Sequence, residues 1–149
     1  LAPENVEEAI KAGVGNKVTM KIGGQVDEPV EVTGTVKVIT DGDSEPPVLR
    51  GRIDLHSFSM GKTALLDCDG NDVVLTQKAC QFNFLFDWRN VGVEPLRKRI
   101  ISIKSPVHYR EHFEPVASKI IEVDTPGLSS VNLEKLDYRN IKHPMVPFD

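Results

Sequence analysis

Cysteine is scarce in this sequence and long apolar runs are missing, and each shortage excludes a class of protein. Cys68 and Cys80 are its two cysteines. Their spacing is not typical of a metal site, and two thiols do not make a disulfide framework, so a reducing, cytoplasmic setting is expected. No apolar run approaches the roughly 18 residues that a membrane-spanning helix requires. We therefore expect no membrane partner.

Charge of one sign is not concentrated in any segment. Eighteen Lys and Arg residues oppose 22 Asp and Glu residues, for a formal net charge of −4. There is no basic cluster with interleaved aromatic residues, the pattern typical of nucleic-acid binding, so nucleic acid is not an expected partner. The chain begins with Leu1-Ala2-Pro3, without a methionine or a secretion signal. We expect that it was processed or cut from a longer chain.

The composition that remains is that of a globular domain. Hydrophobic residues make up 40% of the chain and charged residues 27%. A chain of 149 residues is long enough to bury a core without disulfides. We predict a single domain over residues 1–149.

Alternating apolar residues dominate the first half of the chain. A short helix is predicted over residues 6–12, with Asn5 as its N-cap and Gly13 after its last turn. Period-two alternation then predicts paired strands on either side of Gly23-Gly24, in which the following residues form one buried face: Val18, Met20 and Ile22, then Val30, Val32, Val36 and Val38. A third strand is predicted over 49–55. The turn signal Asp69-Gly70 predicts a hairpin of 64–67 with 72–76.

The second half changes character. Helical spacing over 83–91 stops at Gly92. A strand over 99–104, a helix over 107–118 and a strand over 120–123 predict a β-α-β unit with parallel strands, and an irregular tail follows. The fold class is therefore predicted to be α+β, with mostly antiparallel hairpins first and the β-α-β unit after them.

Ligands gather at the C-terminal edge of parallel strands, which directs attention to residues 104–110. Lys104 and Ser105 end the first predicted strand and lead into the helix that bears His108 and Arg110. Free N–H groups at that helix start could hold an anion, helped by Lys104 and Arg110. Alternatively, Ser105 only caps the helix and Lys104 is solvated. Asp124 ends the second strand and could reach the same edge, although turn chemistry explains it equally well.

Two residues after the hairpin carry side chains with functional potential. The amide of Gln81 could orient a ligand, or it could satisfy backbone groups. Cys80 has no nearby base, so a buried thiol is a better interpretation than a nucleophile.

Residues 108–112 match H-x-x-E-H, the inverted zinc-peptidase motif. In that motif two histidines one helical turn apart bind zinc and the glutamate acts as base. The class also needs an acidic ligand on a second helix well downstream, and only residues 113–149 remain after His112. Glu122 falls on a predicted strand, and Glu134 on a very short helix. Solvated charges at a helix start therefore explain the motif better, and we predict no metal ligands in this chain.

Taken in order, the motifs resemble the C-terminal domain of the MlrC (microcystinase C) metallopeptidase-like family. The likeness covers nearly the whole chain. It rests on the following stretches: Ala12-Gly13-Val14-Gly15 with the Gly-Gly turn, residues 70–76 with Gln81, residues 103–105, His108-Tyr109-Arg110, Phe113-Glu114-Pro115, residues 123–128, and the ending from Tyr138-Arg139 to Pro147-Phe148-Asp149.

The resemblance implies a bacterial protein of two parts, whose N-terminal domain holds the zinc and is absent from this chain. The type enzyme hydrolyses linearised microcystin peptides. This chain would then be an accessory domain of a zinc-dependent peptidase or amidohydrolase, inactive alone, that shapes an interdomain cleft for a peptide or small amide. No cofactor is expected in the chain itself, and zinc is implied for the full-length protein. The alternative hypothesis is a non-catalytic ligand-binding or assembly module.

Carried over residue by residue, the resemblance implies a catalytic role for His108. It implies substrate contacts for the following residues: Lys104, Ser105, Arg110, Gln81 and Asp124. It does not extend to Glu111 or His112, where the family usually has other residues. At Lys78-Ala79 the family tends to have two arginines, so the resemblance implies that a basic contact to substrate or partner domain is lost here.

Overall fold

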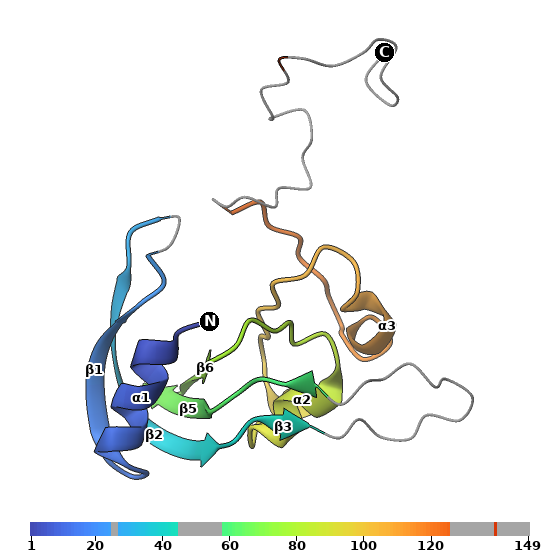
Figure 1. The fold of residues 1–149 in the computed structure, drawn as a ribbon. Helices are drawn as coiled ribbons and strands as arrows, with labels where there is room; N and C mark the ends of the chain where they lie inside the picture. The colour runs from blue at the N-terminus through green and yellow to red at the C-terminus, as the bar shows by residue number, and fades with distance from the viewer. Residues whose placement is uncertain (25–26, 45–57, 126–138, 140–149) are drawn as a thin grey trace.

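The computed structural model describes residues 1–24, 27–44, 58–125 and 139. They form the following elements (Figure 1): α1 (Pro3–Ala12), β1 (Lys17–Ile22), β2 (Val30–Thr40), β3 (Asp43–Ser44), β4 (Phe58–Ser59), β5 (Thr63–Cys68), β6 (Asn71–Thr76), α2 (Leu85–Asn90), the 3-10 helix η1 (Pro95–Arg97) and α3 (Arg110–Phe113). The strand predicted over 49–55 and nearly all of the predicted tail lie outside the described residues. No helix in the described ranges is long and apolar enough to cross a bilayer.

A four-stranded sheet with the order β1-β2-β5-β6 is the centre of the fold. Each of its strand pairs is antiparallel, and β3 and β4 form a separate two-stranded antiparallel sheet. The pairing of Ile22 with Val30 places the predicted turn between β1 and β2. The α+β class and the antiparallel first half of the chain are confirmed.

The hairpin of β5 and β6 forms where the sequence predicts it. Asp69 and Gly70 both adopt positive φ, 52° and 84°, as a two-residue turn that matches strand twist requires. The Asp67 carboxylate accepts a hydrogen bond of 2.8 Å from the Gly70 N–H. Local turn chemistry therefore sets the register of this pair.

Helix α1 ends at Gly13 as predicted, but it begins earlier than expected. Pro3 occupies its first turn, where a missing N–H costs nothing. Asn5 lies inside the helix, whose N-cap is Ala2, and its Nδ2 donates to the Lys21 carbonyl at 3.1 Å. The predicted cap was wrong, since this side chain ties α1 to β1.

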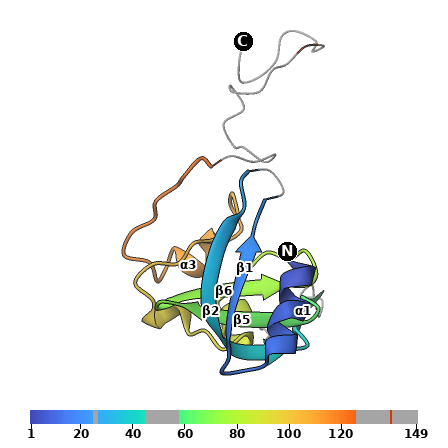
Figure 2. The same cartoon turned by 90° about the vertical axis from the view of Figure 1, so that its left-hand side faces the viewer.

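The sheet is covered on both faces, and Figure 2 shows α1 and α3 on opposite sides of the strands. Helix α1 covers one face through a cluster of buried residues: Val6, Ala9, Val18, Met20, Val36, Ala64, Leu66 and Leu75. The segment around α2 covers the other face through a second cluster: Met60, Leu65, Val91 and Val93, with Val38, Val74, Cys80, Phe82 and Trp88 packed against it. Strand β5 therefore buries side chains on both faces.

A β-bulge in β2 changes which face its valines use. Val36 pairs with Leu66, but Val38 pairs with Leu65, so Lys37 is an extra residue. The insertion reverses the alternation that follows it. Val36 therefore packs under α1 and Val38 packs on the opposite face. The prediction of one buried face for every valine of this strand was wrong for this reason.

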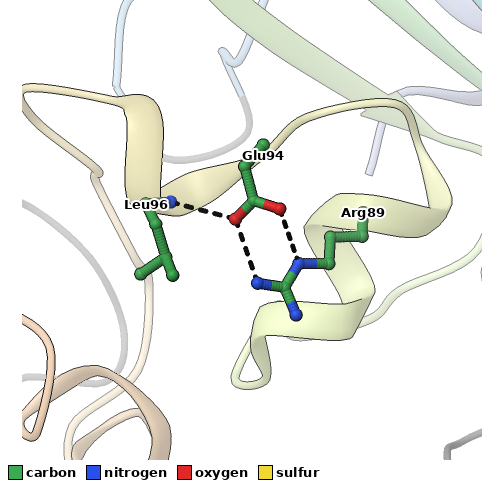
Figure 3. Close-up of polar contacts among 3 residues, drawn as sticks. All are labelled: Arg89, Glu94 and Leu96. Carbon is green, nitrogen blue, oxygen red and sulfur yellow. Dashed lines mark hydrogen bonds and ion pairs between the residues drawn. The ribbon is translucent and has the colours of Figure 1, made fainter.

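Helix α2 lies within the region predicted as helical, 83–91. Glu94 fixes the segment that follows it, as Figure 3 shows. Its carboxylate accepts hydrogen bonds from Arg89 Nε at 2.8 Å and Nη2 at 3.0 Å, and from the Leu96 N–H at 3.2 Å. This bidentate contact joins α2 to η1.

The predicted β-α-β unit does not form in the described part of the chain. Residues 99–104 and 120–123 form no strand there, and α3 takes up four residues of the predicted helix 107–118. Pro115 has no N–H to donate to the carbonyl four residues before it, so the run of helical hydrogen bonds is interrupted here although Glu114 keeps helical angles. A strand needs a paired neighbour, and the order β1-β2-β5-β6 includes neither stretch. The parallel-strand prediction is therefore wrong for these described residues.

Candidate functional site

The predicted site residues of the second half lie on the segment that leads into and through α3. Lys104 and His108 are exposed, and His108 lies in the turn before the helix. Within the described part of the chain, neither side chain makes a hydrogen bond or an ion pair. Both polar groups are therefore accessible to a ligand or to another domain.

Arg110 is engaged by its own chain. Its guanidinium forms an ion pair with the Glu122 carboxylate and lies 3.5 Å from Glu114 Oε1. It also lies 5.4 Å from the centroid of the Tyr109 ring, and the Tyr109 hydroxyl lies 3.5 Å from Glu122 Oε1. Exposed ion pairs exchange partners at little cost. Arg110 thus links α3 to the segment after it, and it could contact a substrate anion only by leaving Glu122.

Ser105 does not cap a helix. Helix α3 begins at Arg110 with Tyr109 as its N-cap, so the alternative interpretation of Ser105 is wrong. Its Oγ is buried and has no hydrogen-bond partner among the described residues. A buried hydroxyl without a partner is costly. The Ser105 hydroxyl is therefore a buried donor and acceptor that the described residues leave without a hydrogen bond.

Gln81 and Asp124 are not brought to a shared strand edge. Gln81 lies between β6 and α2, and its Oε1 accepts a hydrogen bond of 3.1 Å from Asn83 Nδ2. Asp124 is exposed. Because no parallel strands form in the described ranges, the expected edge that would join Asp124 to Lys104 is missing there. Their grouping as substrate contacts stays a prediction.

The H-x-x-E-H residues do not fit a zinc site. His112 is in α3 and its ring packs edge-on against Phe84, with centroids 4.7 Å apart. His108 precedes the helix and is exposed, so the two histidines do not lie one turn apart on one helix. In the part of the chain that the structure describes, no group of three or more His, Cys, Asp or Glu residues is placed to hold a metal ion.

Sequence reasoning missed the acid whose pKa is shifted most among the described residues. Asp87 is fully buried in α2, and burial raises its pKa from 3.8 to about 6. Its Oδ2 accepts from the Phe84 N–H at 2.9 Å, whereas its Oδ1 has no partner among the described residues. Asn83 Oδ1 and Trp88 Nε1 are also buried without a hydrogen-bond partner among the described residues. The sequence does contain a signal for this buried acid, since Asp87 stands among apolar residues in the helical pattern of 83–91.

Cys80 is half-buried rather than buried, so its sequence interpretation holds in part. Burial raises the pKa of its thiol, and a raised thiol pKa lowers the thiolate fraction that a nucleophile needs.

Comparison with known proteins identifies the family. The model of the MlrC C-terminus matches residues 1–140. The chain belongs to this family. It is 25% identical over 157 residues to Microcystinase C of Sphingomonas sp., a match that covers 99% of this chain and 28% of the relative. The likeness inferred from the motifs is confirmed.

A crystal structure shares the fold of this MlrC C-terminal chain. It is that of a candidate metallopeptidase from Mesorhizobium sp. BNC1, with a TM-score of 0.76 and 26% identity. The match covers 99% of this chain and 30% of that protein. The chain thus spans less than a third of the length of either relative.

Proposed function

We propose that this chain acts as the C-terminal domain of an MlrC-like peptidase or amidohydrolase. One observation carries the proposal: almost the whole chain matches less than a third of Microcystinase C and of a candidate metallopeptidase. In this proposal residues 1–149 are a single domain, and an N-terminal domain of the same protein is its partner. The two domains together form the cleft that holds a peptide or a small amide.

Within that cleft, His108 is the catalytic contribution of this domain. Its exposed imidazole, without a hydrogen bond among the described residues, is available to donate to the oxygen that becomes negative during attack on an amide carbonyl. Lys104 and Ser105, a few residues before it, contact the substrate. Arg110 contacts the substrate if it leaves Glu122, and Gln81 and Asp124 make outer contacts.

Zinc would be bound by residues outside this chain, because residues 108–112 do not fit a zinc site. The isolated chain is therefore expected to be inactive. A domain that binds substrate and stabilises a developing charge, without the ligands of the metal, cannot complete the hydrolysis alone.

The test compares the longer polypeptide encoded by the same gene with the 149-residue chain. Each is supplied with zinc and a panel of linear peptides and small amides. We expect hydrolysis by the longer polypeptide only. His108→Ala should lower its kcat/KM about 100-fold to 1,000-fold, the typical loss of an oxyanion donor. His112→Ala is the matched control, since this ring packs against Phe84, and it should change kcat/KM little.

Two results would contradict the proposal. Hydrolysis by the isolated chain with zinc, abolished by His112→Ala, would establish the inverted zinc motif instead. Stabilisation of the isolated chain by carboxylates or phosphates but not by zinc, together with an unaffected His108→Ala enzyme, would establish the ligand-binding module.

A further inference from the structure

Two stretches on either side of α3 have strand-forming sequences but no strand partner in the part of the chain that the structure describes. Residues 99–104 and 119–123 are rich in β-branched side chains. Ile100 is 88% exposed, Ile121 70% and Val123 75%. Isolated apolar side chains are common on protein surfaces, but here two short stretches each expose large β-branched side chains, which favours a surface that a partner covers.

The backbone of both stretches also lacks partners among the described residues, where no backbone–backbone hydrogen bond involves residues 99–104 or 119–123. Backbone groups that lack partners form a template for strand addition, and β-branched side chains favour it. The exposed side chains and the unpaired backbone therefore indicate the same event, which is the addition of these stretches to a sheet.

Neither stretch pairs with the sheet β1-β2-β5-β6. The chain after α3 is drawn without a strand up to residue 125 (Figures 1 and 2). Two ion pairs hold the stretches near their own domain, one between Lys98 and Asp72 of β6 and the other between Arg110 of α3 and Glu122. The first stretch is thus held through Lys98, the residue before it, and the second through its own Glu122.

We propose that residues 99–104 and 119–123 add as strands to a sheet in the remainder of the longer polypeptide. The inference rests on the proposed function, because the partner is the other domain of the same protein. The matched relatives supply the argument for this occupant, since about 70% of each lies outside the match, which covers 28% and 30% of them. Pairing there would complete the strand-helix-strand unit that the sequence favours.

The consequence for the candidate site is direct. Lys104 ends the first stretch, Asp124 follows the second, and His108 lies between them. Fixing both stretches in one sheet would fix these side chains relative to the other domain and would surround the Ser105 hydroxyl. The site would then be assembled by docking.

Backbone amide hydrogen exchange measured by mass spectrometry tests the proposal. In the 149-residue chain, we expect amides of both stretches to exchange at nearly the rate of an unstructured peptide. In the longer polypeptide encoded by the same gene, the same amides should exchange at least about 100-fold more slowly. Amides of β5 and β6 should be protected in both proteins and serve as the internal reference.

Single substitutions separate docking from folding. Ile121→Asp should leave the melting temperature of the 149-residue chain within about 2 °C, because the side chain is exposed there, and should abolish the protection in the longer polypeptide. Ile120→Pro and Ile121→Pro remove N–H groups that point to opposite edges of the strand, so one of these two variants should lose the protection whichever edge is paired, since proline cannot donate to a ladder. Val30→Asp is the matched control: Val30 is 61% exposed on β2, and this change should preserve the protection.

Several outcomes would overturn the proposal. One is equally fast exchange in the longer polypeptide, and another is a gene that encodes nothing beyond these 149 residues. A third is protection already present in the isolated chain. If that protection rises with protein concentration, the pairing partner is a second copy of the chain. If truncation after residue 125 removes it, the pairing partner is the segment 126–149.

Failure of the docking inference is distinguishable from failure of the proposed function. Unprotected stretches in an active enzyme that depends on His108 would reject docking alone. Protected stretches in an enzyme indifferent to His108→Ala would reject the catalytic role and retain docking.

Discussion

Replacing Asp87 with asparagine is expected to stabilise the protein at neutral pH. Asp87 is fully buried, and its Oδ1 has no partner among the described residues. Asparagine has nearly the same shape and keeps an oxygen that can accept from the Phe84 N–H, the hydrogen bond that Asp87 makes at 2.9 Å. It cannot ionise, so the cost of holding a carboxylate away from water disappears.

The magnitude follows from the pKa of Asp87, which burial raises from 3.8 to about 6. One pKa unit corresponds to about 1.4 kcal/mol, so the ionised native state is disfavoured by about 3 kcal/mol. A native pKa above the unfolded value means that the folded protein binds more protons between these two values. The free energy of unfolding therefore falls as pH rises from about 4 to about 6, and this contribution is then constant.

Thermal unfolding followed by circular dichroism between pH 4 and pH 8 measures the effect. Near pH 4 the parent and Asp87→Asn should melt at similar temperatures, because the carboxyl is then largely protonated. Above pH 7 the variant should melt about 6–12 °C higher, since 1 kcal/mol corresponds to about 2–4 °C in a chain of this size. A variant less stable than the parent at pH 7, or a difference that does not change with pH, would refute the burial argument.

Two further predictions concern the sheet. The hydrogen bond from the Gly70 N–H, and then Lys37, hold the pKa of Asp67 below its ordinary value. Asp67→Asn should therefore lower the melting temperature at pH 7, and this loss should disappear as pH falls below about 4. A loss of melting temperature that persists in acid would contradict the lowered pKa. Gly34→Ala should cost about 1–3 kcal/mol, since its Cβ would lie 2.6 Å from Cys68 Sγ. Urea unfolding measures this loss, and Cys68→Ala should restore part of it; a neutral Gly34→Ala would show that β5 can move away.

Local chemistry in the sequence determined the elements of the first half. Asp69-Gly70 specified a turn that needs positive φ at both residues, and Gly13 ended a helix at φ 81°. The order of the motifs also identified the family. The same motifs indicated Lys104, Ser105 and His108 as candidate site residues. These results depend on neighbours in sequence, which a linear pattern records.

The tertiary structure decided the features that depend on distant partners. The bulge at Lys37 divides Val36 and Val38 between opposite faces, and no period in the sequence marks an inserted residue. The raised pKa of Asp87 arises from the packing around α2, and the engagement of Arg110 arises from Glu122. Residues 99–104 and 120–123 have the composition of strands, but a strand exists only beside a partner, and composition alone does not supply one.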